Sequence, residues 1–77
     1  MVKPTRVTNA IRALRFTHGE MTQAELAERI GVSRQTVIAI EQGRYSPSLE
    51  MAFHIARVFK VPLDTVFQYP DSEGQPS

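Results

Sequence analysis

The feature that most constrains the fold of this chain is a three-residue break between two helical segments, made by Gly31, Val32 and Ser33. Glycine readily adopts the left-handed conformation that ends a helix, and serine is a favoured N-cap for the next helix. Because so few residues connect the two segments, the helices on either side must cross closely. The break predicts short helices over 23–30 and 33–42 that form one compact unit.

The start and the end of this unit carry signals of their own. Thr22 and Glu25 form a capping box, in which the hydroxyl accepts the N–H of Glu25 and the carboxylate accepts the N–H of Thr22. Gly43 ends the second helix, and Ala27 is small where the two helices cross. At helical spacing, the expected core contacts of the unit are Leu26, Ala27, Ile30, Val37 and Ile40.

Three further helices are predicted around this unit, which gives an all-α domain of five short helices. The first helix spans 9–18, with Thr8 or Asn9 as its cap. The fourth begins at 46–48, since proline suits the first turn of a helix, and the last runs from 62 to 67. The fourth helix carries an apolar stripe made by Leu49, Ala52, Ile55, Ala56 and Phe59.

Size and composition limit the class of protein. The chain has 77 residues, room for one small domain, and we assign 1–70 to that domain and 71–77 to a disordered tail. It has no cysteine, no apolar run of membrane-spanning length and no alternation that indicates a strand. Neither a metal-ligand cluster nor a catalytic Ser-His-acid set is visible. The sequence predicts a cytoplasmic protein that is not an enzyme and uses no cofactor.

The outer face of the 33–42 helix indicates what it contacts. At about 100° per residue, Val37 and Ile40 turn toward the core, whereas Arg34, Gln35 and Ile38 gather on the opposite side. A guanidinium, an amide and an exposed β-branched side chain are the chemistries that read base edges and thymine methyl groups in DNA. A solvated helix face would more often carry Glu and Lys. This face therefore predicts DNA binding, although the net charge of +1 adds little support.

The chain resembles the Cro/phage-repressor type, or Xre family, of helix-turn-helix regulators. The likeness covers about residues 5 to 69. It implies a five-helix, lambda-repressor-like DNA-binding domain and a small transcriptional regulator that acts as a repressor. The stretches that carry the likeness are 11–15, 22–27, 31–37, 41–44, 47–49 and 55–56.

The resemblance also implies roles for single residues. Gln23 matches a glutamine that touches the DNA backbone, and Arg44 matches a basic residue that meets a phosphate. Arg15 and Glu41 match a pair that joins the first helix to the end of the third. Helix 33–42 is expected in the major groove, with Ala39 as a lesser candidate for contact. The predicted DNA-binding residues are Gln23, Ser33, Arg34, Gln35, Ile38 and Arg44.

Double-stranded DNA and a second copy of the chain are the predicted partners, without a membrane or a small-molecule ligand. A single helix-turn-helix reads too few base pairs to find a site in a genome, so a homodimer is expected. Two alternatives stay open. One is an antitoxin that represses its own operon while its tail holds a toxin, and the other is a protein-interaction module that uses this fold without DNA. The expected dimer surface is Val61, Val66 and Phe67, with Met51 or Val58.

Overall fold

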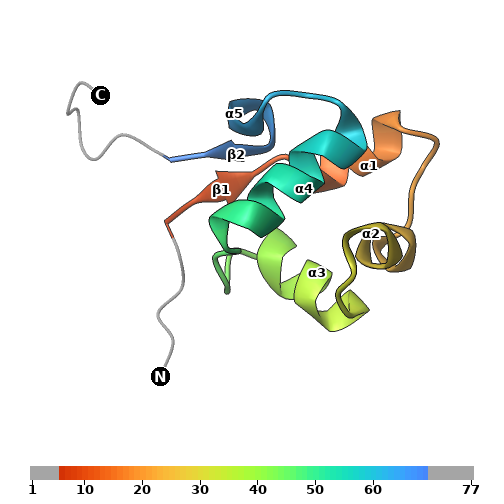
Figure 1. The fold of residues 1–77 in the computed structure, drawn as a ribbon, viewed down its shortest axis with the longest axis horizontal. Helices are drawn as coiled ribbons and strands as arrows, with labels where there is room; N and C mark the ends of the chain where they lie inside the picture. The colour runs from red at the N-terminus through yellow and green to blue at the C-terminus, as the bar shows by residue number, and fades with distance from the viewer. Residues whose placement is uncertain (1–5, 70–77) are drawn as a thin grey trace.

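The computed structural model describes residues 6–69 (Figure 1). Five helices make up most of this part of the chain, which confirms the predicted all-α architecture. The predicted tail at 71–77 lies outside the described residues, so the proposed domain limit at residue 70 stays a prediction. The helices are α1 (Ile11–Thr17), α2 (Gln23–Ile30), α3 (Arg34–Glu41), α4 (Leu49–Phe59) and α5 (Leu63–Val66).

The five helices share a single core. α4 crosses the middle of the molecule in front of α1, while α2 and α3 form its lower part in Figure 1. Each helix contributes at least one side chain that is no more than 1% exposed. A substitution that weakens the packing between any two helices is therefore expected to lower the stability of the whole core. These five side chains are Ile11, Leu26, Val37, Ile55 and Val66.

A two-stranded antiparallel pair corrects the expectation that the chain has no strand. β1 (Thr8–Asn9) pairs with β2 (Phe67–Gln68), with Thr8 opposite Gln68. Strands of two residues are too short to produce an alternating pattern, so the sequence gives no signal for them. The pair joins the two ends of the described chain (Figure 1).

Asn9 belongs to this strand pair and not to α1. Because the pairing holds Asn9 in β1, the helix begins at Ile11, later than predicted. The Asn9 side chain still accepts the N–H of Ile11 at 3.1 Å, and its Nδ2 donates to the carbonyl of Ile40 at 3.0 Å. Thr8, the other predicted cap, donates across the strands to the carbonyl of Gln68 at 3.3 Å. Asn9 thus ties the start of α1 to the end of α3.

The start of α4 also differs from the prediction. Ser48 is the N-cap, and its hydroxyl accepts the N–H of Met51 at 3.1 Å, so Pro47 lies before the helix and not in its first turn. Leu49 becomes the first helical residue and is 67% exposed, which excludes it from the buried stripe. The other four members of the stripe are buried as predicted: Ala52, Ile55, Ala56 and Phe59.

Most of the side chains predicted as a dimer surface pack against the core instead. Val66 is completely buried, so its assignment to a partner surface is wrong. Met51, Val58, Val61 and Phe67 are partly buried and contact the core cluster. The last helix packs onto α4, and Val66 and its neighbours are covered within one chain.

The capping box at the start of α2 forms as predicted. Thr22 Oγ1 accepts the N–H of Glu25 at 3.0 Å, and Glu25 Oε1 accepts the N–H of Thr22 at 2.8 Å. The backbone N–H and then the hydroxyl of Thr22, with a smaller contribution from the charge of Arg29, hold the pKa of Glu25 below its ordinary value of 4.5. The ionised carboxylate is therefore the form that the fold favours.

We expect Glu25→Gln to lower the melting temperature at neutral pH but not in acid. A glutamine keeps the acceptor oxygen of the box and removes only the charge. Because the folded-state pKa is lowered, the stabilisation is fully present above the unfolded-state value and is lost as the pH falls through the folded-state value. Thermal melts between neutral pH and about pH 3 should therefore converge for the variant and the wild type.

Glu28→Gln is the matched control, since Glu28 is exposed on the same helix and lies outside the capping box. The melting temperature of Glu28→Gln should follow that of the wild type at every pH in this range. A constant gap between Glu25→Gln and the wild type at every pH would contradict the role given to the carboxylate.

Candidate nucleic-acid interface

A buried ion pair fixes the position of α1 against the end of α3. Arg15 Nε donates to Glu41 Oε2 at 2.7 Å, and Arg15 Nη2 donates to Oε1 at 3.1 Å. The remaining nitrogen, Nη1, donates to the carbonyl of Met21 at 2.9 Å. The two side chains are only 11% and 9% exposed. The predicted pair is therefore confirmed, and no other ion pair is found within residues 6–69.

Gln23, the first residue of α2, is held by the same carboxylate. Its Nε2 donates to Glu41 Oε1 at 3.2 Å, and the side chain is half-buried. A side-chain amide carries two N–H donors, so one of them is left for another acceptor. The ion pair between Arg15 and Glu41 thus orients the Gln23 amide in the absence of any ligand.

The first turn of α3 projects from this corner. Ser33 is the N-cap, and its hydroxyl accepts the N–H of Thr36 at 3.2 Å. Arg34 and Gln35 follow it and are exposed, whereas Ile38 one turn later is half-buried. The predicted exposure of Ile38 is therefore only partly correct, because part of its side chain packs against the domain.

A shallow hollow runs between α1, α2 and α3 and brings together residues that are far apart in the sequence. Of the predicted DNA-binding residues, Gln23 and Arg34 line it, whereas Ser33, Gln35, Ile38 and Arg44 lie outside its lining. Arg44 is exposed beyond α3, where its Nη1 donates to Gln42 Oε1 at 3.1 Å. The lining is made by Arg12, Arg15, Phe16, Thr22, Gln23, Ala24, Arg34, Glu41 and Gln42.

Arg12 is a candidate that the sequence interpretation missed. Its guanidinium lies 5.9 Å from the centre of the Phe16 ring, and both exposed side chains border the hollow beside Gln23 and Arg34. A ring beneath an arginine holds it by a cation–π contact and leaves its N–H groups free. The signal in the sequence was the spacing of four residues between Arg12 and Phe16, which places them on one side of a helix.

The surface formed by these elements suits a polyanion. It offers the guanidinium groups of Arg12, Arg34 and Arg44 and the amides of Gln23 and Gln35, all of which can donate hydrogen bonds to phosphate or base edges. Within residues 6–69, no three His, Asp or Glu side chains are grouped to hold a metal ion. None of the helices described is long and apolar enough to cross a bilayer.

Comparison with known proteins gives consistent results. Residues 11–66 match the model of the helix-turn-helix family. An uncharacterized HTH-type transcriptional regulator of Methanocaldococcus jannaschii is 49% identical over 65 residues, which are 84% of this chain and 97% of that protein. RstR, the transcriptional repressor of the cryptic phage CTXphi in Vibrio cholerae, is 38% identical over 56 residues, which are 73% of this chain and 50% of the repressor.

A solved structure supports the fold independently. The crystal structure of a protein from Bacteroides fragilis superposes with a TM-score of 0.70 and covers 80% of this chain and 98% of its own. Its sequence identity of 24% limits the comparison to the fold. Together with the five helices, these matches confirm the predicted lambda-repressor-like fold.

Proposed function

Because this chain belongs to the Xre/Cro type of the helix-turn-helix family, we propose that it is a repressor that binds a specific duplex operator with α3 in the major groove. Family membership makes it a transcriptional regulator with a DNA-binding domain, and not an enzyme. The observation that carries the proposal is the exposed first turn of α3, presented on a corner that the Arg15–Glu41 pair holds rigid.

The first turn of α3 reads the bases. Arg34 can donate two parallel hydrogen bonds to a guanine edge, and Gln35 can pair its amide with an adenine edge. The exposed part of Ile38 suits a thymine methyl group. Ser33 caps the helix with its oxygen and lies 3.2 Å from the Thr36 hydroxyl, and its exposed hydroxyl is the group that faces the DNA.

Three side chains, from α1, from α2 and from the segment after α3, contact the phosphates. Gln23 offers its second amide N–H, already oriented by Glu41. Arg12 borders the hollow that Arg34 also lines, and Arg44 follows the C-terminal end of α3. Contacts of this kind position the helix and carry no sequence information by themselves.

Repression is the regulatory outcome that fits this arrangement. A compact domain bound over a promoter excludes polymerase by occupying the same duplex, and needs no contact with it. One relative, RstR, is named a transcriptional repressor, and the two chains are 38% identical over 56 residues.

Selection from a pool of random duplexes tests the proposal. We expect a short sequence to be enriched, and its affinity to fall as salt rises, because each phosphate contact releases counterions. The enriched sequence placed over a promoter should then lower transcription when the protein is added. Failure to enrich any sequence at low salt would overturn the proposal.

Arg44→Ala should weaken binding to all duplexes alike. Since Arg44 is assigned to a phosphate, its loss should reduce the slope of log affinity against log salt by about one. Lys60→Asn is the matched control: it also removes one positive charge, it lies at the end of α4, and asparagine tolerates the positive φ of 57° found there. A loss of affinity for the operator alone, without a loss for other duplexes, would instead indicate that Arg44 contacts a base.

A further inference from the structure

One exposed aromatic ring lies on the surface assigned to DNA. Phe16 is 57% exposed, and it lines the hollow that also carries Gln23 and Arg34. It belongs neither to the core cluster nor to the partly buried side chains that pack against that cluster. A ring that stays in contact with water adds little to the stability of a fold, so the role of Phe16 lies in what it contacts on the surface.

The ring contacts Arg12, one turn earlier on α1. The guanidinium carbon lies 5.9 Å from the ring centre, within the range of a cation–π interaction. Helical side chains lean toward the N-terminus, which brings the ring back under the arginine. Both side chains also border a second hollow, made with Asn9, Ala10 and Ala13, so the pair forms a ridge between two hollows. The guanidinium is therefore held at the surface of α1 and stays exposed.

No carboxylate competes with the ring for this guanidinium. Glu41 is the acid that lines the same hollow, and both of its oxygens already accept hydrogen bonds from Arg15, with a further one from Gln23. Within residues 6–69, Arg12 forms no ion pair. An ion pair would fix the arginine and also neutralise it. The ring of Phe16 fixes the direction of Arg12 and leaves its positive charge available to an anion.

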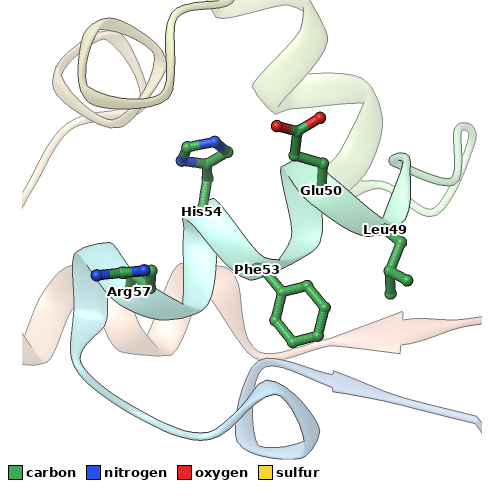
Figure 2. A pocket seen from close by; sticks show the side chains of 5 residues that line it. All are labelled: Leu49, Glu50, Phe53, His54 and Arg57. Atoms are coloured by element: carbon green, nitrogen blue, oxygen red, sulfur yellow. The ribbon is translucent and has the colours of Figure 1, made fainter.

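Residue spacing alone does not create such a pair. Phe53 and Arg57 are also four positions apart on one helix, and both line a shallow hollow along α4 (Figure 2). In that view the Phe53 ring points toward the strands, whereas Arg57 extends toward the C-terminal end of α4 and away from the ring. Within the described part of the chain, no arginine lies over the ring of Phe53. The contact on α1 is therefore specific to the geometry of that helix.

We propose that Phe16 is a positioning residue for DNA binding, which orients Arg12 toward a phosphate without touching the DNA itself. The proposal rests on the proposed function, which assigns Arg12 to a phosphate. A free arginine loses rotamer freedom when it binds, whereas a guanidinium already held by a ring loses less. At an exposed site a cation–π contact changes a binding constant by about two- to fivefold, and this is the expected contribution of Phe16.

Substitution of the ring separates orientation from charge. Phe16→Leu should lower the affinity for the operator by about two- to fivefold and leave the slope of log affinity against log salt unchanged, because Arg12 still displaces a counterion. Arg12→Ala should lower the affinity and also reduce this slope by about one. Phe16→Tyr keeps an aromatic face under the guanidinium and should retain the wild-type affinity. If Tyr and Leu weaken binding equally, the aromatic face has no role and the proposal is wrong.

A double-mutant cycle tests whether Phe16 acts through Arg12. In the Arg12→Ala background, Phe16→Leu should cause no further loss of affinity, because there is no guanidinium left to orient. An equal loss in both backgrounds would show that the ring contacts the DNA itself, and would overturn the positioning role.

Phe53→Leu is the matched control for the loss of an exposed ring. Phe53 is 49% exposed and has no arginine over it in the described chain. On an operator trimmed to the part that one copy of the chain contacts, this variant should keep the wild-type affinity and salt slope. A loss as large as that of Phe16→Leu would overturn the proposal. The melting temperatures of both leucine variants should stay close to the wild-type value, since both rings are exposed.

The outcomes separate this proposal from the proposed function. A phosphate contact carries no sequence information, so the same cycle can be measured on a random duplex at low salt. If no operator is enriched, the proposed function fails, and the cycle on the random duplex decides the role of Phe16. If an operator is enriched but Phe16 and Arg12 show no coupling, the positioning role fails and the proposed function stands.

Discussion

Arg15→Ala and Glu41→Ala are each expected to lower the free energy of unfolding by about 3 kcal/mol, or the melting temperature by roughly 15 °C. Both side chains are about one-tenth exposed, and each would leave the other charge without its partner. Removing Arg15 also leaves the carbonyl of Met21 without its donor. Because all five helices share one core, the loss should appear as a single cooperative shift in thermal melts.

Two further variants distinguish an orphaned charge from lost packing. Arg15→Met combined with Glu41→Leu replaces both charges by apolar groups, and should be more stable than either single alanine variant. Arg12→Ala is the matched control on the same helix, since its guanidinium is exposed and contacts only the Phe16 ring among the interactions described. Unchanged melting temperatures for both alanine variants would contradict the structural role of the pair.

Loss of sequence discrimination is the second large effect expected. Arg34→Ala and Gln35→Ala should each weaken binding to the operator by about 1–3 kcal/mol, or roughly 5- to 150-fold, because each base contact is lost. Binding to a scrambled duplex should change little. The double variant should therefore bind operator and scrambled duplex with similar affinity. Neither change should alter the melting temperature, since both side chains are exposed.

Titrations of both duplexes for each variant measure this effect. Repeating the selection with Arg34→Ala should relax the preference at one base position of the enriched sequence. Arg29→Ala, an exposed arginine in the last turn of α2, is the matched control for the lost charge. Equal weakening of operator and scrambled duplex would mean that Arg34 and Gln35 contact only the DNA backbone.

The sequence by itself determined the central unit of the fold. The limits of α2, the capping box of Thr22 and Glu25, the cap at Ser33 and the left-handed Gly31 all appear where they were predicted. Each of these features depends on hydrogen bonds between residues no more than five positions apart, so the local sequence carries the information. The Arg15–Glu41 pair was also anticipated, but from the family resemblance and not from the spacing of the two residues.

Tertiary structure decided what the surface around this unit contains. The pairing of β1 with β2 moved the start of α1, and the packing of α5 on α4 buried Val66 and left the Leu49 side of α4 open. The packing of α1 against α2 and α3 brought Arg12 beside Gln23 and Arg34. These outcomes depend on how helices distant in sequence fit together. Periodicity places a side chain on a face of its own helix, but only the packed neighbours determine whether that face is covered.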